Sequence, residues 1–197
     1  MVKKLIKHLK QGTLIKRISK IIKISYLSLK FRLSRQTPIV AITFDDGSET
    51  DYTVAYPLME KRGIKGTSYI TTAWIEARSR KLTWEQIKEL KQVGWTIGCH
   101  TNTHPRLTEL KAEDIHQEMQ DVNRVFELHD LEPPEHHAYP LGRYNDQVID
   151  VIRHYRKTGR APGGGVPLDY RSSDPYLLPT NEPILHNEQD LIEIKKK

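Results

Sequence analysis

Short apolar segments rich in β-forming residues alternate with segments of helical periodicity along most of the chain. The apolar segments cover residues 39–44, 67–70 and 95–99, and the helical ones a stretch ending near residue 63, then about 83–94, 112–129 and 145–155. Thr83 with Gln86 is typical of a helix-starting capping box, and Asn145 is the expected N-cap of the last helix. Strands that alternate with helices pair in parallel, so the sequence predicts an α/β fold, either a barrel or a doubly wound sheet. In both folds, functional side chains gather where strands end.

The chain is long enough for one domain with its own core. It has 197 residues, of which 37% are hydrophobic and 28% charged, the balance of a globular protein. No apolar run approaches the roughly 20 residues that cross a bilayer. Cys99 is the single cysteine, which excludes an intramolecular disulfide and a Cys-rich zinc site.

The net charge of +6 resides in the N-terminal segment. Residues 1–36 hold 11 lysines and arginines and no acid, whereas residues 37–197, with 20 basic and 25 acidic side chains, carry −5 and are not expected to bind nucleic acid. Apolar residues between Leu14 and Ile22 recur at helical spacing among lysines, which predicts a basic amphipathic helix suited to peripheral contact with an anionic membrane. The alternative is an arm that packs on the body or stays loose. We expect an arm at 1–36 and a folded domain at 37–197.

Asp45 and Asp46 stand directly before Gly47, at the end of the first apolar segment. Neighbouring side chains of a strand point to opposite faces, so both carboxylates can serve one site only if the backbone turns sharply. Gly47 permits such a turn. The alternative is an ordinary Asp-Gly turn with solvated acids.

His100 and His104 follow the third apolar segment in the same way. Two imidazoles and one carboxylate form a three-ligand set that leaves metal positions open, and zinc or another divalent transition metal accepts it. The chain has nine histidines, so the spacing of this pair also arises by chance. We predict Asp46, His100 and His104 as metal ligands, and Asp45 as the base that takes a proton from water.

A further strand is expected to end in residues 138–142, Ala-Tyr-Pro-Leu-Gly. Pro140 and Gly142 could hold a backbone N–H toward a developing oxyanion. The same Pro-x-Gly sequence is also typical of a simple turn.

Three segments together resemble the motifs of the polysaccharide deacetylases of carbohydrate esterase family 4, the NodB-homology domain. They are residues 43–47 (Thr-Phe-Asp-Asp-Gly), 100–105 (His-Thr-Asn-Thr-His-Pro) and 138–142. The resemblance covers about residues 38–197. It implies a distorted (β/α) barrel with fewer than eight strands, a divalent metal for which we expect zinc, and hydrolysis of N-acetyl groups in chitin, peptidoglycan or a related exopolysaccharide.

The resemblance also assigns roles. Asp45 is the general base, the three residues predicted above hold the metal, and the backbone of Leu141 helps to bind the oxyanion. The neighbours of Leu141, which are Tyr139, Pro140 and Gly142, are expected to contact the substrate. In many relatives an arginine that steadies the base stands where this chain has Ala138, and a tyrosine stands at position 141.

Arg160 could replace the arginine missing at position 138. The family's last motif is a strand carrying a histidine that acts as general acid, and His186 fits it superficially. We favour a different alignment, in which residues 188–197 begin a helix that precedes that strand. His186 is then an ordinary loop histidine, and we expect the domain to lack its last strand and to be C-terminally incomplete.

We therefore predict a metal-dependent hydrolase that removes N-acetyl groups from an N-acetylhexosamine-containing polysaccharide. One alternative is a catalytically weak or inactive glycan-binding protein of the same fold. Another is an inert domain that the basic arm attaches to a membrane or to nucleic acid. If the chain is such a hydrolase, its partner is an N-acetylated polysaccharide. The basic arm at residues 1–36 predicts a membrane-associated or cell-envelope location.

Overall fold

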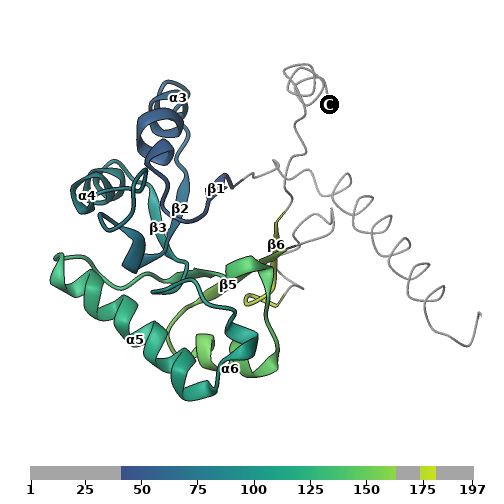
Figure 1. Cartoon of the computed structure of the whole chain (residues 1–197). Coiled ribbons are helices and arrows are strands. Elements are labelled where there is room, and N and C mark those ends of the chain that lie inside the picture. The colour runs from purple at the N-terminus through teal and green to yellow at the C-terminus, as the bar shows by residue number, and fades with distance from the viewer. Residues whose placement is uncertain (1–40, 163–173, 181–197) are drawn as a thin grey trace, which may run out of the picture.

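The computed structural model of the chain describes residues 41–162 and 174–180 (Figure 1). Six strands form one parallel sheet in which the strand order follows the sequence: β1 Thr43–Phe44, β2 Thr67–Ile70, β3 Thr96–Cys99, β4 His136–Ala138, β5 Thr158–Pro162 and β6 Leu178–Thr180. A doubly wound sheet reverses its order partway, whereas this order never reverses. The fold is therefore the barrel type of the two alternatives. Within the described residues β1 and β6 do not pair, so the curled sheet is a partial barrel.

A helix connects each strand to the next from β1 to β5. These helices are α3 Tyr56–Glu60, which continues a π-helical turn at Asp51–Ala55, then α4 Trp84–Gln92, α5 Ala112–Leu128 and α6 Asp146–Arg153. The capping box at the start of α4 is present, with Thr83 and Gln86 each accepting the other's backbone N–H. Asn145 caps α6 by accepting from the Val148 N–H at 2.9 Å. Both predicted helix starts are confirmed.

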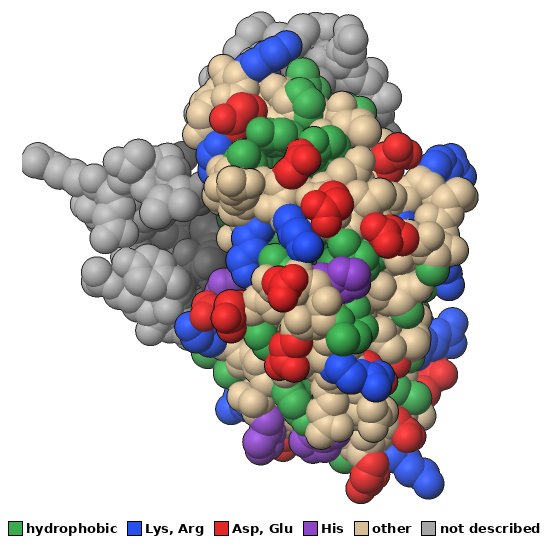
Figure 2. All heavy atoms as spheres, turned by 90° about the vertical axis from the view of Figure 1, so that its left-hand side faces the viewer, with side chains coloured by type: hydrophobic (Ala, Val, Ile, Leu, Met, Phe, Trp, Pro, Cys, Tyr) green, Lys and Arg blue, Asp and Glu red, His purple; other side chains and the backbone are tan. Residues whose placement is uncertain are grey.

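One core fills the space between the sheet and these helices. The apolar side chains that the helical periodicity predicts on α5 are all buried, namely Ile115, Met119, Val122 and Phe126. On the outer face, over α3, α4 and α5, acidic and basic side chains are interspersed (Figure 2). Each helix therefore buries an apolar face and exposes a charged face to solvent. The carboxyl ends of the parallel strands remain available for a site.

Three predictions fall outside the described ranges. They concern the arm at 1–36 with its boundary to the domain, His186, and the helix expected at 188–197. Across the part of the chain that the structure does describe, the helices are too short or too polar to traverse a bilayer.

Candidate metal centre and active site

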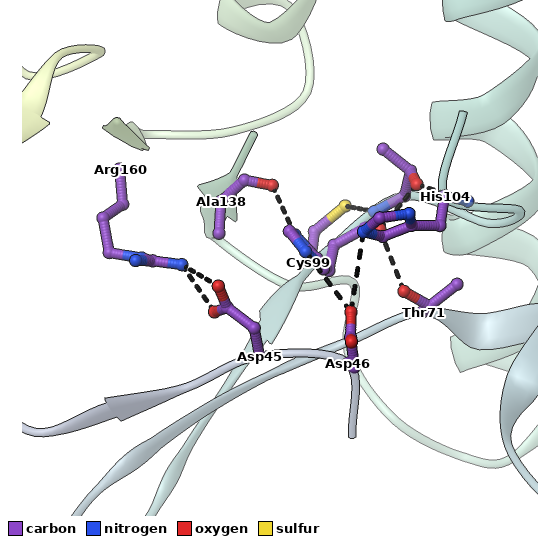
Figure 3. A network of polar contacts seen from close by, with 9 residues as sticks. Asp45, Asp46, Thr71, Cys99, His104, Ala138 and Arg160 are labelled. Carbon is purple, nitrogen blue, oxygen red and sulfur yellow. Dashed lines mark hydrogen bonds and ion pairs between the residues drawn. The ribbon is translucent and has the colours of Figure 1, made fainter. Parts of the chain in front are cut away.

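The backbone turns sharply after β1. Asp46 and Gly47 both adopt the left-handed conformation, with φ of 70° and 59°. A side chain at Gly47 would be strained by the positive φ, and its Cβ would lie tightly against the Ile75 Cδ1 atom at 3.0 Å and the Ile70 Cγ2 atom at 3.1 Å. The turn sends the carboxylate of Asp45 toward Arg160 and that of Asp46 toward His104 (Figure 3).

Asp46, His100 and His104 meet at the rim where β1 and β3 end. The Asp46 Oδ1 atom lies 3.6 Å from the Nε2 atom of each histidine, and the three candidate ligand atoms lie within 4.8 Å of one another. Two ligands of a tetrahedral zinc at about 2.1 Å from the metal lie roughly 3.4 Å apart, so the spacing fits such an ion. The structure thus brings the predicted ligands together, and they form an Asp-His-His group that could bind a metal.

The state of His100 also fits a metal ligand. Its Nδ1 atom contacts the backbone carbonyl oxygen of Ala138 at 2.7 Å, an arrangement that requires a proton on Nδ1 and leaves Nε2 free to ligate. Burial lowers the pKa of His100, although the charge of Asp45 acts in the opposite direction. A neutral imidazole is the form that binds a metal.

The loop that carries the two histidines is held by Glu118 of α5. The Oε2 atom of Glu118 accepts from the backbone N–H groups of Asn102 and Thr103, each at 2.9 Å, and Oε1 accepts from the Thr103 hydroxyl at 2.6 Å. Sequence analysis did not identify Glu118, because no motif marks a charged residue on a helix as the partner of a distant loop.

Trp74, in a short 3₁₀ turn at Thr72–Trp74 after β2, lies against the metal site. Its ring centroid is 4.9 Å from that of His104, with 33° between the ring planes. Sequence analysis missed this residue too. Its place just beyond the end of a strand is the signal that could have identified it.

The carboxylate of Asp45 is bound by Arg160. One terminal nitrogen of the guanidinium lies 2.5 Å from both Asp45 oxygens (Figure 3). The guanidinium carbon lies 5.1 Å from the ring centroid of Tyr69. Arg160 on β5 is in register with Ala138 on β4, and in-register residues of parallel strands face the same side of the sheet. Arg160 therefore approaches the Asp45 carboxylate from the strand next to the one that carries Ala138, the position at which the family resemblance implies an arginine.

Residues 139–142 form a tight turn after β4. Leu141 has φ of 56° and a side chain 58% exposed, while the side chains of Tyr139 and Pro140 are buried and the Tyr139 hydroxyl donates to the Tyr176 carbonyl oxygen at 3.0 Å. A side chain at Gly142 would meet the Pro162 ring at 2.6 Å. Of the four residues assigned to catalysis or substrate contact here, only Leu141 presents an exposed side chain.

The comparisons with known proteins agree with this geometry. The model of the polysaccharide deacetylase family matches residues 33–159, so the chain belongs to that family. YxkH of Bacillus subtilis (strain 168), which its name assigns to the polysaccharide deacetylases, is 36% identical over 124 residues, or 63% of this chain and 43% of YxkH. The peptidoglycan-N-acetylmuramic acid deacetylase PdaA of the same strain is 27% identical over 56% of this chain and 41% of its own length.

Structural similarity extends further than sequence similarity. The Streptococcus pyogenes deacetylase PplD, solved in complex with acetate, superposes with a TM-score of 0.68 at 28% identity and covers 87% of this chain and 76% of PplD. IcaB from Ammonifex degensii, at 19% identity and a TM-score of 0.65, shows the same fold. The chain spans less than half the length of the curated relatives described above.

Proposed function

We propose that this chain is a metal-dependent hydrolase that removes N-acetyl groups from an N-acetylhexosamine-containing polysaccharide. The main support for the proposal is that two groups lie together at the carboxyl ends of the strands. They are the Asp46–His100–His104 cluster and the Asp45 carboxylate that Arg160 binds. Its substrate class is supported by relatives named as deacetylases of peptidoglycan and of poly-β-1,6-N-acetyl-D-glucosamine, the latter from Staphylococcus aureus.

Each residue has a defined task in this hydrolysis. Asp46, His100 and His104 would hold the metal, for which we propose zinc, and a bound zinc supplies Lewis acidity toward the acetyl carbonyl. Asp45 takes a proton from the water that adds to the carbonyl carbon, and Arg160 keeps its carboxylate aimed at that water. The backbone N–H of Leu141 donates to the oxyanion. As the oxyanion collapses and the C–N bond breaks, the leaving nitrogen takes the proton that Asp45 accepted from the water, which gives acetate and the free amine.

Chelation tests this proposal directly. We expect the purified chain to release acetate from N-acetylglucosamine oligomers, to lose that activity after a chelator and dialysis, and to regain it when zinc is added back. Binding of the oligomers without acetate release, at full zinc occupancy, would instead support a glycan-binding protein. Failure to bind zinc would refute the assignment of the three ligands.

We also propose that residues 37–197 form the catalytic domain and that residues 1–36 make peripheral contact with an anionic membrane. The arm's 11 basic residues support this. Deleting residues 1–36 should abolish binding to anionic liposomes and leave acetate release unchanged. Unchanged liposome binding, or aggregation of the remaining domain, would favour an arm that packs on the body.

A further inference from the structure

Two cations contact Trp74, the indole that also contacts the predicted metal site, and they have no part in the chemistry described above. The guanidinium carbon of Arg78 lies 3.9 Å, and the Lys81 Nζ atom 4.8 Å, from the centroid of the indole ring. The same ring lies 4.9 Å from that of His104. One aromatic side chain therefore contacts both a predicted metal ligand and two positive charges.

A cavity of about 310 Å³ opens beside these cations. The described residues that line it are Ser48, Thr50, Ser79, Arg80 and Lys81. Three of these residues carry a hydroxyl group and two are basic, and none of the five is acidic. Hydroxyl, guanidinium and ammonium groups all donate hydrogen bonds, so the cavity has the chemistry of a receptor for an oxyanion.

The cavity is tied to the loop that carries the catalytic carboxylates. Ser48 is two residues beyond Asp46, so their Cα atoms lie at most ~7 Å apart. Backbone hydrogen bonds of 3.0 Å join the two walls, from the Glu49 N–H to the Arg80 carbonyl and from the Leu82 N–H to the Gly47 carbonyl. A group bound in the cavity is thus close enough to belong to the sugar whose acetyl group reacts or to its neighbour.

The positive charge of this surface is only lightly compensated. Arg78, Arg80 and Lys81 form no ion pair with the side chains of residues 41–162 and 174–180. Two exposed acids lie in the same segments: Glu49, between the lining residues Ser48 and Thr50, and Glu76, which accepts from the backbone N–H of Trp84 at 3.0 Å. The carboxyl of Asp51, on which the charge of Lys81 acts, is buried.

We infer that this cavity binds an anionic substituent of the glycan, a phosphate or a carboxylate, so that the chain prefers acidic N-acetylated glycans to neutral ones. The inference rests on the proposed function and adds a substrate class to it. Charged groups at a partly exposed site attract an anion by Coulomb forces that salt screens, and each contributes a modest factor.

The test compares three N-acetylglucosamine oligomers of equal length, one neutral, one phosphorylated and one carboxymethylated. We expect kcat/KM for acetate release, and affinity measured by titration calorimetry, to favour the anionic oligomers by about three- to tenfold in low salt. The preference should fall toward unity in about 0.5 M salt. It should also disappear in the double variant Arg80→Gln/Lys81→Gln and persist in the control Lys61→Gln/Lys91→Gln, which removes the same charge from exposed positions remote from the cavity.

Failure of the inference is distinguishable from failure of the proposed function. Equal acetate release from all three oligomers would overturn the inference and leave the deacetylase assignment intact. If no oligomer is deacetylated, calorimetry still decides: tighter binding of the anionic oligomers that is lost only in Arg80→Gln/Lys81→Gln supports the cavity, and equal binding refutes it. A preference for one anionic oligomer would identify phosphate or carboxylate as the bound group.

Discussion

The two neighbouring aspartates belong to halves of the site that are assembled in different ways. The half that we propose for the metal comprises Asp46, His100 and His104, which follow β1 and β3 within five residues, and the backbone has positive φ at Asp46 and at His104. The base half joins Asp45 to Arg160, a residue 115 positions away on β5. Two strand ends and the turns of their loops are enough to bring the three proposed ligands together, whereas the contact that would orient the proposed base requires β5 to hold Arg160 within reach of Asp45.

The largest effect is expected from substituting the two adjacent carboxylates, Asp45 and Asp46, one at a time. Asp45→Asn should lower acetate release by about 10²–10⁴-fold, because it removes the proton acceptor, while zinc affinity stays near that of the unchanged chain. Asp46→Ala should lower zinc affinity itself. Acetate release and zinc binding, measured on both variants, check the assignment, and the opposite pattern would show that the roles are exchanged.

The second prediction targets the register on which the base half depends. Arg160→Ala should lower kcat by about 10–100-fold with a small change in KM, because the carboxylate loses its fixed orientation. Adding Ala138→Arg should restore much of that kcat, since position 138 faces the same side of the sheet on the next strand. Steady-state kinetics of the single and double variants test this. A double variant as slow as Arg160→Ala, though folded by circular dichroism, would argue against a shared task for the two positions.

The third prediction concerns Asp51, a buried carboxyl bound by the Ser68 hydroxyl at 2.6 Å and repelled by both Asp45 and Asp46. Burial raises the pKa of Asp51 to about 6. The folded chain therefore holds this proton more tightly than the unfolded chain, so the contribution of Asp51 to stability is fully present below about pH 4 and is lost as the pH rises through 6. Asp51→Asn should remove this loss and stabilise the chain at pH 8 by on the order of 2 kcal/mol.

Urea unfolding across pH 4–8 measures this effect. Zinc should reduce the loss in the unchanged chain, because neutralising Asp46 weakens the repulsion that raises the pKa of Asp51. The Ser68→Ala variant serves as the control for loss of the hydrogen bond alone. An unfolding free energy with the same pH dependence in Asp51→Asn and the unchanged chain would exclude Asp51 as its source.

The smallest effect is expected at the support of the metal half. Glu118→Gln keeps the size of the side chain but weakens its hydrogen bonds to the loop that holds the histidines. Zinc affinity should fall by about tenfold, which is the lower limit of the roughly 10–100-fold loss seen when a residue that orients metal ligands is changed. Glu113→Gln, at an exposed position of the same helix, is the matched control. Equal zinc affinities in the two variants would mean that the loop keeps its shape without Glu118.

Local sequence determined the features that depend on neighbours along the chain. The capping residues Thr83 and Asn145 act within one helical turn, and the stripe of α5 follows from its own periodicity. The carboxylates and histidines could be placed at strand ends because each follows its apolar segment within one to five residues. Their roles as base and metal ligands remain predictions that the experiments above address.

Tertiary structure alone decided the rest. The segments β5 and β6 contain glycine, arginine and proline in place of an alternating apolar pattern. They become strands because β5 pairs with β4 and β6 pairs with β5 in the sheet. Arg160 could be suspected from a missing arginine, but its contact with Asp45 follows only from the register of two strands. The contacts of Trp74 and Glu118 with the histidine loop likewise join elements that share no local signal, because packing across a sheet is set by the whole fold and not by spacing along the chain.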